Sequence, residues 1–170
     1  LSRQNREQML AILRDTHVGG LGAAALGTLL IVKFAALVEI SGALRLWALL
    51  LFPLVGRLSM SAAVCLFGYA RPGAGMGRAY AQETGYRDLA VALLLSILLV
   101  AAAFGYIRPS LEEVSIIFLA AAVAVGGSYL LARRIAAKLG GLTGDVYGAV
   151  NEVAELLFLL AMVAGAAGLA

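Results

Sequence analysis

The fold is decided by residues 89–107, which read LAVALLLSILLVAAAFGYI and contain no charged side chain. A second run of the same length, residues 114–132, reads VSIIFLAAAVAVGGSYLLA and is also uncharged. As an α-helix that rises 1.5 Å per residue, each run would be about 28 Å long, which is close to the hydrocarbon thickness of a bilayer. Both runs therefore predict helices that cross a membrane.

The composition of the whole chain agrees with these two runs. Of its 170 residues, 62% are hydrophobic and only 14% are charged, and the mean hydropathy is +0.96. Soluble domains carry about 45–50% apolar and about 25% charged residues, and disordered chains carry still fewer apolar ones. The net charge of +3 is spread along the chain, so no nucleic-acid partner is predicted. A single cysteine, Cys65, excludes an internal disulfide.

Three further apolar segments carry isolated charges. Residues 18–38 contain Lys33, residues 46–70 contain Pro53 and Arg57, and residues 143–170 are uncharged after Glu155. Proline removes a backbone donor, so the second of these helices is expected to bend or break at Pro53. Period-2 alternation is absent, which argues against a barrel. The sequence predicts an all-α, polytopic membrane bundle of five spans, with residues 1–170 as one membrane domain.

Basic residues are distributed unequally between the two sides of this bundle. Nine fall on the side of the N-terminal segment and only two, Arg45 and Arg108, on the other. The nine are Arg3, Arg6, Arg14, Arg71, Arg78, Arg87, Arg133, Arg134 and Lys138. Since Lys and Arg are retained on the cytoplasmic side of membranes, the first side is predicted to be cytoplasmic.

Acidic residues enter the fifth span. Asp145, Gly148 and Glu152 are spaced i, i+3 and i+7 and share one helical face, while Glu155 lies on an adjoining face. A carboxylate in hydrocarbon needs a partner or a function, and hard oxygen ligands suit Mg²⁺ bridged to phosphate. For Asp145 a simple helix-start charge is the alternative, with Thr143 as the N-cap.

Basic groups supply the opposite charge. Arg71 and Arg78 flank a loop with glycines at three alternate positions, 73, 75 and 77, which suits a phosphate but also suits a flexible loop with topology markers. Lys33 either snorkels to the interface or pairs with an inward acid, and Arg57 needs a partner as well. These groups fit metal-assisted transfer of a phosphate-bearing group, and equally an ion-coupled transporter or channel. A lipid-head-group phosphotransferase is a weaker third reading, because its Asp-rich helix motif is absent.

Five segments, in order, resemble the cobalamin synthase family, the adenosylcobinamide-GDP ribazoletransferases. They are MLAILRDTHVGGLG at 9–22, KFAAL at 33–37, PLVGR at 53–57, YARPG at 69–73 and GLTGDVYGA at 141–149. The resemblance implies a Mg²⁺-dependent transferase of cobalamin biosynthesis that joins adenosylcobinamide-GDP to α-ribazole or its 5′-phosphate and releases GMP. It also implies a multi-pass protein of a bacterial or archaeal cytoplasmic membrane, with its active site facing the cytoplasm and homo-oligomerisation left open.

The resemblance also suggests site residues. Asp145, Glu152 and Arg71 are the catalytic candidates, and Asp145, Glu152 and Glu155 the metal ligands. The candidates for substrate binding are Arg14, Asp15, Lys33, Arg57, Arg78 and Thr143. Relatives carry an acidic motif upstream of the Arg–Asp stretch, and nothing in residues 1–15 matches it. The chain is therefore expected to be the C-terminal portion, with the N-terminal segment of the same protein as a partner and inactivity of this portion alone as one expectation.

The predicted orientation can be tested by labelling substituted cysteines in sealed vesicles. Cysteines replacing Arg71 and Arg108 are expected to react with an impermeant reagent from opposite sides, because they lie on opposite sides of the third span. A Cys65→Ser background removes the native thiol. Labelling of both positions from the same side would contradict the five-span arrangement.

Overall fold

A computed structural model describes residues 6–13, 17, 19–70 and 76–168, and every regular element in these ranges is a helix. The elements are α1 (Arg6–Ile12), α2 (Gly20–Glu39), α3 (Gly42–Leu66), α4 (Met76–Glu83), α5 (Tyr86–Tyr106), α6 (Leu111–Leu139) and α7 (Gly144–Ala166). Five of them, α2, α3, α5, α6 and α7, are long and apolar enough to cross a membrane. The predicted all-α bundle with five spans is confirmed.

Two helices differ in detail from their predicted spans. Helix α6 continues seven residues past the uncharged run to Leu139 and is capped by Gly140, which has a φ of 70°. Arg133, Arg134 and Lys138 thus lie on the last turns of α6 and not in a connection, because long basic side chains are good helix formers. Helix α3 runs without interruption through Pro53, so of the two predicted outcomes the break does not occur and the single span is confirmed.

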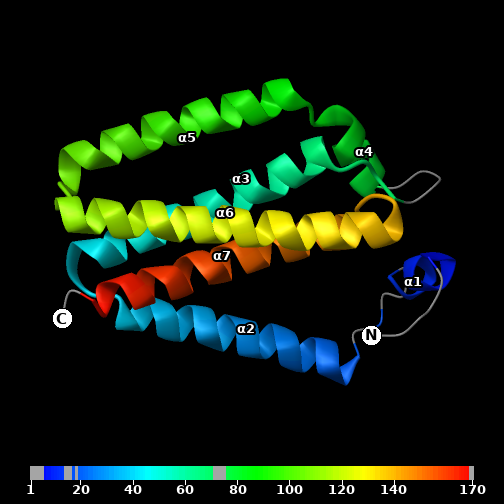
Figure 1. Ribbon diagram of the computed structural model, residues 1–170, viewed down its shortest axis with the longest axis horizontal. Helices are drawn as coiled ribbons and strands as arrows, with labels where there is room; N and C mark the ends of the chain where they lie inside the picture. The colour runs from blue at the N-terminus through cyan, green and yellow to red at the C-terminus, as the bar shows by residue number, and fades with distance from the viewer. Residues whose placement is uncertain (1–5, 14–16, 18, 71–75, 169–170) are drawn as a thin grey trace.

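Helix α7 is the centre of the bundle. It packs along α6 and α3 and also contacts α2 (Figure 1). Its inward face is apolar, with Phe158, Leu159 and Met162 fully buried against Trp47 and Ala48 of α3 and Ala120 and Ala124 of α6. Small residues let α6 and α7 approach closely: Gly127 lies against Leu157, and Gly165 lies against Ile116.

The basic end is the end of the bundle at which α1, α4, the start of α5 and the end of α6 meet (Figure 1). Its described basic residues are Arg6, Arg78, Arg87, Arg133, Arg134 and Lys138. The backbone joins two connections here: Ala70 N–H donates to Leu142 O and Leu142 N–H donates to Gly68 O, both at 2.8 Å. Arg6 donates from Nε to Leu139 O at 2.6 Å and from Nη2 to Ala70 O at 2.9 Å. Segments distant in sequence are thus joined beside Asp145.

The backbone hydrogen bonds of Gly68 and Ala70 with Leu142, here called the backbone joint, depend on Gly141, whose φ is 138°. A Cβ at this position would lie against Gly68 O and 2.9 Å from Ala70 N, so Gly141→Ala must disturb both backbone bonds. We expect the free energy of unfolding to fall by about 1–3 kcal/mol, measured by denaturant titration in detergent. Gly126→Ala is the control, since its Cβ meets nothing within 4 Å. Equal stability of the two variants would contradict the close backbone contact of Gly141 with Gly68 and Ala70.

Candidate polar site between α2 and α7

A charged cluster lies between α2 and α7. Lys33 Nζ is 2.6 Å from Glu152 Oε2 and 2.6 Å from Glu155 Oε2. The side chains of Lys33 and Glu155 are only 9% and 10% exposed, whereas that of Glu152 is 39% exposed. The prediction that Lys33 pairs with inward acids is confirmed, and the snorkelling alternative is wrong. The cluster is closed on the side of Glu155 and open on the side of Glu152.

Two uncharged residues complete the cluster. Asn151 Nδ2 donates to Glu155 Oε1 at 2.8 Å and more weakly to Glu152 Oε1 at 3.3 Å. Gly56 of α3 lies directly against the side chains of Glu155 and Asn151. Three helices therefore contribute to one polar group inside an otherwise apolar bundle.

An exposed polar face leads from the basic end to this cluster. Asp145 and Gly148 are exposed, and the partly exposed Glu152 follows them on the same face of α7. Glu152 lies eight residues into the helix, or about 12 Å from its start. The first seven residues of α2, 20–26, are exposed as well, so the described helices leave this face open. The predicted sharing of one face by Asp145, Gly148 and Glu152 agrees with this pattern of exposure.

The other predicted residues are placed differently. Arg57 follows Gly56 and is exposed, and no ion pair joins it to the described residues. Arg78 is on α4 at the basic end. Thr143 is the N-cap residue of α7, as predicted, but its side chain makes no capping bond. The buried hydroxyls of Thr143 and Tyr147 have no hydrogen-bond partner among the described residues. Arg14, Asp15 and Arg71 lie outside the described residues.

The predicted metal ligands are not gathered into one site. Within the described ranges, no group of three or more His, Cys, Asp or Glu side chains is placed to hold a metal ion. Lys33 Nζ already bonds to both Glu152 and Glu155, so it occupies the position that a cation shared by these two carboxylates would take. Asp145 lies two helical turns before Glu152. The three carboxylates do not by themselves fit a Mg²⁺ ion.

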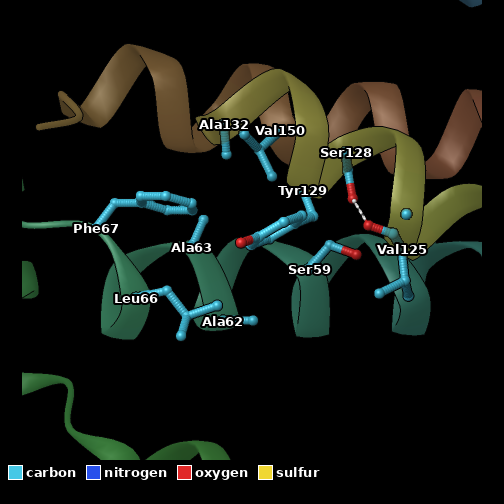
Figure 2. A pocket seen from close by; sticks show the side chains of 11 residues that line it. Ser59, Ala62, Ala63, Leu66, Phe67, Val125, Ser128, Tyr129, Ala132 and Val150 are labelled. Atoms are coloured by element: carbon cyan, nitrogen blue, oxygen red, sulfur yellow. Dashed lines mark hydrogen bonds between the residues drawn. The ribbon is translucent and has the colours of Figure 1, made fainter. Parts of the chain in front are cut away.

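A separate cavity of about 240 Å³ lies between α3 and α6 (Figure 2). Its walls are apolar apart from Ser59, Ser128 and Tyr129, and the rings of Phe67 and Tyr129 are 5.8 Å apart in its lining. The Ser128 hydroxyl donates to Val125 O, whereas the buried Ser59 hydroxyl has no partner in the described part of the chain. None of the predicted site residues that the structure describes lines this cavity.

The chain is similar to known proteins over almost its whole length. The family model described as cobalamin-5-phosphate synthase matches residues 1–163. The chain belongs to this family. The five short segments predicted the same family, and that prediction is confirmed. The cobalamin-5-phosphate synthase match covers the entire cluster around Lys33 as well as the basic end.

Curated relatives are named adenosylcobinamide-GDP ribazoletransferase. The relative from Thermoanaerobacter sp. (strain X514) is 35% identical over 162 residues, which are 95% of this chain and 62% of the relative. Those from Caldanaerobacter subterraneus and Chlorobium phaeovibrioides are 32% and 37% identical, over 92% of this chain and 60% and 61% of the relatives. The chain thus spans about three fifths of the length of these relatives. No solved structure matches. The names give the transporter or channel alternative no support.

Sequence reasoning missed Asn151, and it treated Gly56 only as a letter of the PLVGR segment. The signal for Asn151 was present, since an amide inside a membrane span is costly unless it is hydrogen-bonded, and two carboxylates follow it in the sequence. The signal for Gly56 was not, because only the fold brings α3 against Glu155. Arg6 was used only as a marker of the cytoplasmic side, although it also donates hydrogen bonds to the carbonyl oxygens of Leu139 and Ala70.

Removing the ammonium should leave two carboxylates facing each other. We expect Lys33→Met to lower the free energy of unfolding by about 3–5 kcal/mol, measured by denaturation in mixed detergent micelles. The triple variant Lys33→Met/Glu152→Gln/Glu155→Gln removes all three charges and is expected to recover most of that loss. A Lys33→Met variant as stable as the original chain would show that the ion pairs do not hold α2 on α7.

Proposed function

We propose that this chain forms the part of an adenosylcobinamide-GDP ribazoletransferase that contains the polar face of α7. The proposal includes adenosylcobinamide-GDP and α-ribazole, or its 5′-phosphate, as substrates and GMP as the released product. The single observation that carries it is the exposed face from Asp145 to Glu152, which begins at the basic end and finishes at a carboxylate held by Lys33. Cation-rich surroundings suit a pyrophosphate, and a fixed carboxylate suits a reacting hydroxyl.

In the proposed reaction a ribazole hydroxyl oxygen bonds to the phosphorus attached to the corrinoid. The bond from that phosphorus to the GMP oxygen breaks, and the hydroxyl proton passes to a carboxylate. Glu152 is the best placed acceptor, because Lys33 engages its Oε2 whereas its Oε1 has only the 3.3 Å contact with Asn151. Lys33 keeps the carboxylate oriented and is itself too buried to reach a large substrate.

The basic end would bind the phosphates. Arg78 lies there, and the backbone joint holds Ala70, the residue before Arg71, beside Leu142. Arg14, Asp15 and Arg57 stay predicted substrate-binding residues, and Arg71 stays a predicted catalytic residue. By the positive-inside rule this end faces the cytoplasm, which supports a cytoplasmic active site in the cell's inner membrane.

Dependence on Mg²⁺ stays a prediction. When bound, the ion would neutralise phosphate charge. Mg²⁺ often takes only one or two carboxylates, with substrate phosphates and water as the other ligands. Either Asp145 or Glu152 would supply one such carboxylate on the open side, whereas Glu155 is closed in by Lys33 and Asn151.

The test uses the complete protein in proteoliposomes, supplied with adenosylcobinamide-GDP, α-ribazole and Mg²⁺, with GMP release as the measurement. We expect Glu152→Gln to lower kcat by about 10²–10⁴-fold, because it removes the proton acceptor but keeps the shape of the side chain. Glu39→Gln, the same exchange on an exposed residue of α2, is the control. Absence of GMP from the unaltered protein would overturn the proposed function. Normal turnover of Glu152→Gln would overturn only the role of Glu152.

A further inference from the structure

The two glutamates that share Lys33 are bonded unequally. Both oxygens of Glu155 have close partners, Lys33 Nζ at 2.6 Å and Asn151 Nδ2 at 2.8 Å, and its side chain is 10% exposed. Glu152 has one close partner, Lys33 Nζ, and its second oxygen is 3.3 Å from Asn151 Nδ2. Glu155 is therefore fixed, while Glu152 keeps an oxygen for a further bond.

Asn151 is held in its position at a cost. It is 5% exposed, and its Oδ1 is buried without a hydrogen-bond partner among the described residues. An apolar side chain of similar size would avoid an unpaired buried acceptor. What such a side chain lacks is the Nδ2 donor that reaches both carboxylates. The role of Asn151 thus lies in that donation.

Gly56 provides the space for Glu155. A Cβ on Gly56 would lie 2.6 Å from Glu155 Cγ, 2.8 Å from Glu155 Oε1 and 3.0 Å from Asn151 Oδ1. Real Cβ atoms do not approach other atoms closer than 3.0 Å, so any other residue must displace the Glu155 side chain and is in tight contact with the amide of Asn151. Gly56 is in the interior of α3, where Ala would be the better helix former. The glycine therefore serves the contact and not the helix.

We propose that Gly56 and Asn151 are positioning residues that act through Glu155. They hold Glu155 as the anchor of Lys33, and Lys33 in turn presents Glu152 to the open face. This assignment rests on the proposed function for its effect on catalysis, but the coupling between Gly56 and Glu155 does not. It divides the acidic pair into one residue that fixes the cluster and one that meets the substrate.

The catalytic test compares Gly56→Ala and Asn151→Ala with Gly105→Ala in the complete protein. Gly105 is also inside a spanning helix, and a Cβ there meets nothing within 4 Å. We expect kcat for GMP release to fall about ten- to a hundredfold in the first two variants, because small misplacement of a reacting group has effects of this size. KM should change less than about threefold, since neither residue touches substrate. A rise in KM without a fall in kcat would overturn the proposal. A fall in kcat no larger than that of Gly105→Ala would overturn it as well.

A double-mutant cycle tests the coupling without relying on activity. In the unaltered background, Gly56→Ala is expected to lower the melting temperature in detergent, because the new Cβ displaces Glu155. In a Glu155→Ala background the two closest atoms, Cγ and Oε1 of Glu155, are gone and only the 3.0 Å contact with Asn151 Oδ1 remains, so the same exchange should lower the melting temperature much less. An equal effect in both backgrounds would overturn the assignment. If the unaltered protein releases no GMP but the cycle shows coupling between Gly56 and Glu155, the result counts against the proposed function alone.

Discussion

The structure depends on one ammonium group placed between two carboxylates inside an apolar bundle. Lys33 is the fixed point at which α2 meets α7, while the first seven residues of α2 are exposed all round. A buried charge without its partner costs several kcal/mol, so few other arrangements of these two helices are available. The pairing also sets the rotation of α7, because Glu152 and Glu155 must point toward α2 while Phe158 and Leu159 point into the core.

Helix α7 therefore has an apolar surface and a polar surface on different sides. Its apolar surface packs on α3 and α6 at small residues such as Gly127 and Gly165. Its polar surface runs from Asp145 to Glu152 and is accessible from the basic end. The backbone joint between Gly68, Ala70 and Leu142 lies just before the start of α7. It therefore fixes the segment that follows α3 next to the start of the polar surface.

The sequence was sufficient for the spans, since charge-free runs of 19 residues have few alternatives in a chain this apolar. It also predicted the partnership of Lys33 with acids, because an intramembrane cation needs one. It did not predict that Glu152 is partly exposed and Glu155 buried, since the exposure of each side chain depends on how α2 and α3 pack against α7. It could not find the contact of Gly56 with Glu155, which joins residues far apart along the chain. The extension of α6 past Ala132 was missed because hydropathy marks the lipid-facing part of a helix and not its end.

The separation of Lys33 from its partners has a consequence for biosynthesis. The two ion pairs join residues 119 and 122 positions apart. The ribosome makes a chain from its N-terminus, so α2 reaches the insertion machinery well before α7 is synthesised. During that interval Lys33 has neither carboxylate, and a central lysine costs a helix about 2.5–3.5 kcal/mol on insertion. The strongly apolar remainder of α2 must offset this cost during the interval, and the ion pairs form only when α7 enters the membrane.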